Sequence, residues 1–95
     1  MRIFEIKDKS GRNIYLSNER WKHITKHPEM QDKHILEKIK DTLIKPDTII
    51  SESYEVAIHT YYRYAKERKK YLLVSVKYLN GEGYVITSFY TDVIQ

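Results

Sequence analysis

Residues 20–27 combine two histidines with an arginine in a short basic stretch that reads RWKHITKH. With 3.6 residues per helical turn, Arg20, His23 and His27 would share one side of a helix. Histidine transfers protons near neutral pH because its ordinary pKa is about 6.5, and arginine neutralises the charge of a phosphate group. The stretch therefore has the residue types that a phosphodiester-cleaving site needs, although an ordinary basic surface helix has the same pattern.

A zinc site is the other chemistry that this stretch suggests, because His23 and His27 have the i, i+4 spacing of a ligand pair. The rest of the chain does not favour it. No glutamate follows His23 directly, no third ligand is evident, and the sequence contains no cysteine. The three glycines do not form a loop that would hold a nucleotide. We therefore expect neither a metal nor a cofactor.

The size and charge of the chain fit a small domain that can bind a polyanion. Its 95 residues are expected to form a single domain, residues 1–95, and the formal net charge is +4. The basic residues form an early and a late cluster: Arg20, Lys22, Lys26 and Lys33, then Arg63, Lys66, Arg68, Lys69 and Lys70. Such clusters suit a nucleic-acid backbone, but two solvated surfaces would look the same.

The location of the protein is expected to be cytoplasmic, without a membrane partner. No apolar run approaches the roughly 18 residues that a membrane span needs. The first residues alternate like a β-strand and lack the apolar core of a signal peptide.

A β-hairpin and two helices are expected in the first half of the chain. Alternating residues predict strands at 2–7 and 13–16, with turn residues between them. Ser17 or Asn18 can cap a first helix, which runs to about residue 27 and ends before a proline. Apolar residues at i, i+4 and i+8 spacing predict a second helix over about residues 31–44.

The second half of the chain changes from helical to strand periodicity. We expect strands at residues 48–51, 56–63, 71–79 and 84–91, joined by short turns into an antiparallel meander. The predicted fold is therefore α+β, with an N-terminal β-hairpin and two α-helices packed on one face of a four-stranded antiparallel β-sheet. If Arg63, Lys77 and Ser88 share the open face of this sheet, they form a polar, cationic patch.

Tyrosine is frequent for a chain of this length, with nine residues, most of them in the second half. Exposed rings such as Tyr61 or Tyr62 could stack on RNA bases. Packing of the rings on a half-buried sheet explains the same enrichment without a ligand.

Six segments of the chain together resemble a known family. They are Trp21-x-His23-Ile24, His27-Pro28-Glu29, Lys45-Pro46-Asp47, Tyr61-Tyr62, residues 71–77 (YLLVSVK) and residues 84–91 (YVITSFYT). In this order and spacing they resemble the phage-type branch of the Barnase–EndoU–colicin–RelE-like nuclease superfamily. The resemblance covers roughly residues 14–94.

The resemblance implies a compact RNase fold and metal-free cleavage of RNA by a toxin or phage nuclease. It implies a catalytic role for His23, for Lys77 on a central strand, and for the hydroxyls of Ser88 and Thr91. Arg20, His27, Tyr61, Tyr62 and Arg63 are the expected substrate-binding residues. An antitoxin or immunity protein is the partner that such a toxin implies.

The function that we expect is that of a metal-independent endoribonuclease, acting on tRNA or mRNA. The 2′-hydroxyl of the RNA attacks the phosphate and leaves a 2′,3′-cyclic phosphate, so DNA is not an expected substrate. Two alternatives remain open at this point. The chain can be a non-catalytic RNA-binding module, or a protein-interaction domain that uses an exposed sheet edge.

Overall fold

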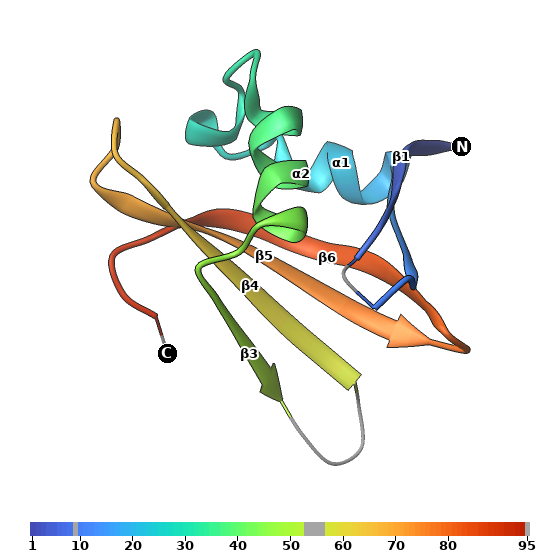
Figure 1. Cartoon of the computed structure of the whole chain (residues 1–95). Coiled ribbons are helices and arrows are strands. Elements are labelled where there is room, and N and C mark those ends of the chain that lie inside the picture. Colours follow the sequence, from blue (N-terminus) through green and yellow to red (C-terminus); the bar gives the residue numbers. More distant parts are fainter. Residues whose placement is uncertain (9, 53–56, 95) are drawn as a thin grey trace.

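The computed structural model describes residues 1–8, 10–52 and 57–94, and in these residues it has six strands, two α-helices and a 3₁₀ helix (Figure 1). Their bounds are β1 (Arg2–Lys7), β2 (Asn13–Ser17), α1 (Asn18–Ile24), η1 (Pro28–Met30), α2 (Ile35–Ile44), β3 (Thr48–Glu52), β4 (Ala57–Ala65), β5 (Lys70–Leu79) and β6 (Glu82–Thr91). The strands lie close to their predicted positions. Residue 56, the predicted start of one strand, lies outside the described residues.

All six strands form one mixed sheet in the order β1-β2-β6-β5-β4-β3. Neighbouring strands are antiparallel except β2 and β6, which run parallel and pair Ile14 with Gly83 and Tyr15 with Tyr84. The expectation of a four-stranded antiparallel sheet is therefore wrong, while the α+β class holds. The predicted hairpin, β1–β2, is part of the sheet because β2 pairs with a strand from the far end of the chain. Local periodicity and turn residues carry no signal for such a pairing.

Burial explains why the hairpin joins the sheet. Ile14 and Leu16 of β2 are fully buried in the same core as Val85 of β6. An isolated two-stranded hairpin is only marginally stable in water, so this shared core stabilises it. Gly83 lies at the junction, where an added Cβ would be 2.8 Å from the ring of Tyr78. The absence of a side chain thus lets β6 pass close to its neighbours.

Both helices are shorter than the sequence predicts. Ser17 caps α1 with its side chain, but α1 ends at Ile24 instead of near residue 27. The Thr25 hydroxyl bonds back to carbonyls of the last turn, and Pro28 starts the separate helix η1. The second helix, α2, begins at Ile35 rather than near residue 31. In the described part of the chain, no helix has the length and apolar character needed to cross a membrane.

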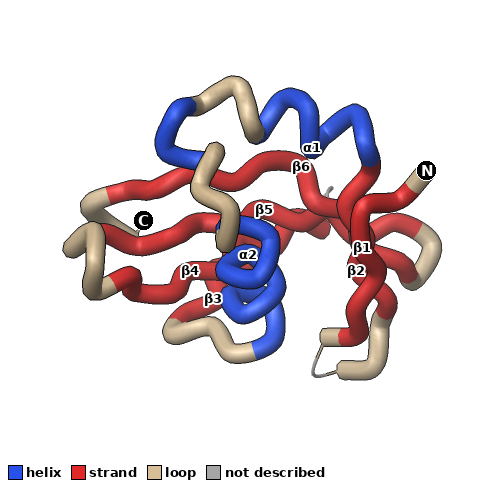
Figure 2. The backbone as a smooth tube through the Cα atoms, turned by 90° about the horizontal axis from the view of Figure 1, so that it is seen from above, coloured by secondary structure: helices blue, strands red, loops and turns tan. Residues whose placement is uncertain are grey.

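The helices lie on one face of the sheet, as Figures 1 and 2 show. On β5, Leu72, Val74 and Val76 belong to the core on this face, as the sequence predicts. Ile39 and Leu43 of α2 are buried against them in the same cluster. Burying such aliphatic side chains contributes about 1.5–3 kcal/mol each, so this contact fixes the position of α2 on the sheet.

Candidate nucleic-acid interface

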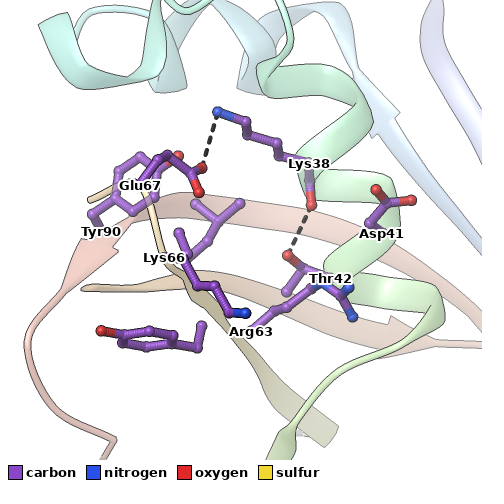
Figure 3. A pocket seen from close by; sticks show the side chains of 10 residues that line it. Lys38, Asp41, Thr42, Arg63, Lys66, Glu67 and Tyr90 are labelled. Atoms are coloured by element: carbon purple, nitrogen blue, oxygen red, sulfur yellow. Dashed lines mark hydrogen bonds and ion pairs between the residues drawn. The ribbon is translucent and has the colours of Figure 1, made fainter. Parts of the chain in front are cut away.

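A cleft of about 310 Å³ lies between α2 and the strand ends of β4 and β5 (Figure 3). The charged and polar residues that line it include Lys38, Asp41, Arg63, Lys66, Glu67 and Tyr90, and we call this site the basic cleft. Three of these side chains are cations and two are carboxylates. A hollow with several converging cations suits a phosphate group more than an apolar ligand.

The turn between β4 and β5 supplies Lys66 to the cleft and carries further cations beside it. Ala65 pairs with Lys70 at the end of the hairpin, and the turn between them contains the exposed residues Lys66, Arg68 and Lys69. Lys69 has a positive φ of 55°, which closes the turn. The late basic cluster of the sequence therefore lies at one end of the sheet, where the hairpin holds its members close together.

Lys38 of α2 forms two ion pairs, and the one with Glu67 links the helix to this turn. Its Nζ lies 2.6 Å from an Asp32 carboxylate oxygen and 3.2 Å from Oε1 of Glu67. The hydrogen bond to Asp32 raises the pKa of Lys38, while burial opposes this shift. A bond from its own backbone N–H and one from Lys38 lower the pKa of Glu67. At neutral pH the cleft therefore holds a charged ammonium beside an ionised carboxylate.

Tyr90 has the only buried side-chain polar atom without a hydrogen-bond partner among the described residues. The residue is 7% exposed, and the guanidinium carbon of Arg68 lies 4.6 Å from the centre of its ring. Burial raises the pKa of Tyr90, and the charges of Lys38 and Arg68 oppose this shift, as does the Arg68 side chain as a donor near the hydroxyl oxygen. The hydroxyl proton has no acceptor in the part of the chain that the structure describes, which is costly for a buried group, and a bound anion can supply that acceptor.

The residues of the basic helical stretch lie elsewhere. Arg20 and His23 are exposed on α1, and His23 lines a shallow depression with Lys22 and Lys26. His27 follows the end of α1 and precedes η1, so the three predicted residues do not share one helix. In the described ranges, no three His, Asp or Glu side chains come together as a metal-binding group would require.

The predicted strand residues lie on both faces of the sheet. Arg63 lines the basic cleft on the helix side, where its Nη1 donates to the Lys45 carbonyl at 2.6 Å. Ser88 is fully buried, and its hydroxyl donates to the backbone carbonyl of Leu73 at 2.8 Å. Lys77 points to the opposite, helix-free face, because it alternates with the core residue Val76. The structure thus does not bring these three groups together.

A β-bulge contributes to this difference. Ser75 pairs with Thr87, but the next residue on β5, Val76, pairs with Val85. Ile86 is therefore an extra residue on β6, and it shifts the alternation of side chains along that strand. Simple alternation places Ser88 on the face opposite Val85, whereas both are buried on the helix side.

The remaining predicted residues are similarly divided. Tyr61 is buried in the core on the helix side, and its hydroxyl is hydrogen-bonded to that of Tyr78. Tyr62 is only 4% exposed, so neither ring of this pair offers an open stacking surface. Thr91 pairs with Tyr71 at the end of β6, and its hydroxyl contacts the Val93 carbonyl. Of the nine predicted site residues, only Arg63 lines the basic cleft.

Sequence reasoning missed Lys38, Glu67 and Tyr90 as members of a site. The charges of Lys38 and Glu67 are visible in the sequence, but their ion pair joins α2 to a turn that follows β4. The importance of Tyr90 rests on a buried hydroxyl without a partner. A single sequence carries no signal for that property, because it depends on every neighbour of the atom.

A second pocket of about 190 Å³ lies on the other flank of α2. It is lined by Asp8 and Arg12 from the β1–β2 connection, His59 from β4, and the apolar residues Leu43, Pro46 and Ile49. We call it the arginine pocket. Asp8 is its anchor, since the carboxylate accepts hydrogen bonds from the Ser10 amide at 2.8 Å, the Arg12 amide at 3.0 Å and the Tyr78 hydroxyl at 2.9 Å.

Replacing Asp8 with asparagine is expected to lower the free energy of unfolding by about 2 kcal/mol, because bonds to a charged acceptor are lost. Burial alone raises the pKa of Asp8, but hydrogen bonds from Ser10, Tyr78 and backbone amides outweigh it and leave the pKa below 3.8. The carboxylate therefore stabilises the fold above about pH 4, and this contribution is lost as the pH falls further. Urea unfolding at pH 7 and at about pH 3 measures it.

The control for this experiment is Asp92→Asn, because the Asp92 side chain is 77% exposed. We expect it to change stability little at either pH. If Asp8→Asn lowers the free energy of unfolding by the same amount at both pH values, the effect does not come from the charge of the carboxylate.

The fold and the basic cleft together describe an α+β domain with a cationic site on the helix side of its sheet. The chain belongs to the family of phage-Barnase-EndoU-ColicinE5/D-RelE like nuclease2, whose family model matches residues 3–94. This confirms the resemblance seen in the sequence and identifies the chain as a member of a nuclease family. The comparisons with curated proteins and with solved structures gave no match.

Proposed function

We propose that the protein is a toxin-like endoribonuclease that binds the scissile phosphate of RNA in the basic cleft and needs no metal. The observation that carries this proposal is the buried hydroxyl of Tyr90, which has no acceptor among the described residues. It lies close enough to Lys38 and Arg68 for both charges to affect its pKa. A phosphate oxygen would supply the missing acceptor, and the two cations would offset its charge.

The reaction that fits these groups starts with attack of the RNA 2′-hydroxyl on the adjacent phosphorus. Glu67 is ionised and accepts the 2′-proton, while Tyr90 and Arg68 donate hydrogen bonds to the non-bridging oxygens. The bond from phosphorus to the 5′-oxygen breaks, and that oxygen takes a proton from solvent at the open cleft. The products are a 2′,3′-cyclic phosphate and a 5′-hydroxyl end.

Phosphate binding at Tyr90 requires a local movement of the turn. The hydroxyl is shielded from solvent, but Glu67 and Arg68 beside it are exposed side chains. Long side chains on a turn reorient rapidly, so an incoming phosphate can displace them without a change in the sheet.

The expected substrate is RNA rather than DNA, because the nucleophile is the 2′-hydroxyl. Cytoplasmic tRNA or mRNA fits this chemistry, and an antitoxin or immunity partner would present carboxylates to the exposed cations of the β4–β5 turn. A non-catalytic RNA-binding module is the second candidate. It is favoured by one observation, that no histidine lines the basic cleft in the described residues.

The test is to incubate the purified protein with a defined single-stranded RNA in excess EDTA and to identify the product ends. We expect cleavage with 2′,3′-cyclic phosphate ends, and none when the scissile ribose is replaced by deoxyribose. RNA that binds but stays intact supports the second candidate instead.

The same assay tests the role of the helix histidine. His23→Ala is expected to retain activity, because His23 is exposed on α1 and does not line the basic cleft. Loss of cleavage with unchanged RNA binding would place the catalytic centre at α1, as the sequence predicts. That result would contradict the assignment of catalysis to the basic cleft.

A further inference from the structure

The guanidinium of Arg12 is held flat in the arginine pocket by three contacts. Its carbon lies 3.8 Å from the centre of the Tyr78 ring. Its Nε donates to Ser10 Oγ at 2.9 Å and to a carboxylate oxygen of Asp8 at 3.3 Å. Within the described ranges, its two terminal nitrogens donate no hydrogen bond. A fixed, planar pair of donors therefore remains for a ligand.

His59 lies against the same tyrosine. Its ring meets Tyr78 edge to face, with centroids 4.9 Å apart, and its Nδ1 is 3.1 Å from Ser51 Oγ. Burial and then the charge of Arg12 lower the pKa of His59, while Asp8 opposes them. The imidazole is therefore neutral at pH 7 and adds a hydrogen-bonding group to the pocket without adding charge.

The character of the walls indicates what kind of ligand fits. Leu43, Pro46 and Ile49 form an apolar side, and Ile49 is 44% exposed. The positive charge of Arg12 is already offset by Asp8, so a phosphate gains little here. A flat group with an apolar face and two adjacent acceptors on one edge matches these walls and donors best.

We propose that the arginine pocket binds a guanine base of the RNA, with O6 and N7 accepting from the terminal nitrogens of Arg12. Guanine presents these two acceptors side by side, whereas adenine has a donor in place of O6. This inference rests on the proposed function, since it assigns a base preference to the same substrate. Both sites reach α2 on the helix side of the sheet: the β4–β5 turn contributes to the basic cleft, and the β1–β2 connection contributes to the arginine pocket.

Fluorescence anisotropy with short uridine-rich 2′-O-methyl oligonucleotides tests this assignment. Such oligonucleotides cannot be cleaved by 2′-attack, so binding is measured whether or not the protein is a nuclease. An oligonucleotide with one guanine is expected to bind about tenfold or more tightly than one with adenine at that place. Replacing the guanine by 7-deazaguanine, which lacks the N7 acceptor, is expected to remove most of this preference.

The variant for this experiment is Arg12→Lys, which keeps the charge but loses the paired donors. We expect it to bind the guanine and adenine oligonucleotides equally. The matched control is Arg2→Lys, because Arg2 also stacks on a tyrosine, Tyr15 at 3.7 Å, and pairs with Glu82. It should keep the guanine preference. Thermal melting shows whether each variant is folded.

The outcomes of this experiment distinguish failure of the guanine assignment from failure of the proposed function. A guanine preference that survives Arg12→Lys in a folded protein overturns the base assignment. If the variant does not fold, the wild-type protein alone provides the test. Equal affinity of the wild-type protein for the guanine and the 7-deazaguanine oligonucleotides then overturns the base assignment. RNA binding without any base preference rejects the guanine site but not the proposed nuclease function. If the protein binds no RNA at all, both the guanine site and the proposed function are rejected.

Discussion

Replacing Tyr90 with phenylalanine is expected to reduce the rate of RNA cleavage about 10²–10³-fold, because a hydrogen-bond donor to the phosphate is lost. The same change is expected to leave the free energy of unfolding unchanged or to raise it by about 1 kcal/mol. The hydroxyl is buried and has no partner in the described part of the chain, so its removal relieves a desolvation penalty. Single-turnover kinetics and urea unfolding of the same preparation measure the two effects.

The control is Tyr84→Phe, which removes a hydroxyl from the same strand. Tyr84 pairs with Lys77 and belongs to the helix-free face, away from the basic cleft. It should leave the cleavage rate unchanged. A Tyr90→Phe protein that is less stable and fully active would show that the hydroxyl serves the fold and not the substrate.

Replacing Glu67 with glutamine has the largest expected effect on catalysis, a loss in kcat of about 10²–10⁴-fold with little change in KM. The amide cannot accept the 2′-proton, while its size and position are kept. Glu67 is exposed, so its ion pair with Lys38 contributes little to stability and the variant should fold normally. Steady-state kinetics separate kcat from KM.

The pH dependence of the wild-type rate provides a second readout for Glu67. Because the pKa of Glu67 is lowered below its ordinary 4.5, the base stays ionised as the pH falls from 7 to about 5. The rate should therefore hold over this range, whereas a histidine base would lose activity around its ordinary pKa of about 6.5. A fall in rate near that value would favour a histidine.

The matched control for Glu67 is Glu37→Gln. Glu37 is also an exposed glutamate paired with a lysine, Lys40 at 3.5 Å, but it does not line the cleft. Its replacement should leave kcat unchanged. If Glu67→Gln instead strengthens RNA binding and keeps kcat, the carboxylate competes with the phosphate for Lys38 rather than acting as the base.

The secondary structure could largely be predicted from the sequence because it depends on local patterns. Alternation on β5 correctly predicted that Leu72, Val74 and Val76 face the helices. The parallel pairing of β2 with β6 could not be predicted, since its partners Tyr15 and Tyr84 lie far apart in the chain. Sheet order depends on which buried faces match, and a single sequence does not encode that in a local signal.

The candidate site was predicted less well, for three physical reasons. The first helix ends at Ile24, so His27 leaves the stripe that it was expected to share. The bulge at Ile86 shifts the alternation along β6 and puts Ser88 in the core. The basic residues of the β4–β5 turn were visible as a cluster, but the buried hydroxyl that we propose as the phosphate donor belongs to Tyr90 on β6.

The strand order also sets when this domain can complete its sheet during synthesis on the ribosome. Of the six described strands β6 is synthesised last, yet it lies between β2 and β5 and carries Tyr90. Until β6 emerges, the hairpin β1–β2 and the strands β3–β5 are two separate pieces with no shared sheet. A nascent chain without β6 therefore lacks the complete cleft, and the site that we propose for RNA forms only after β6 has been inserted between β2 and β5.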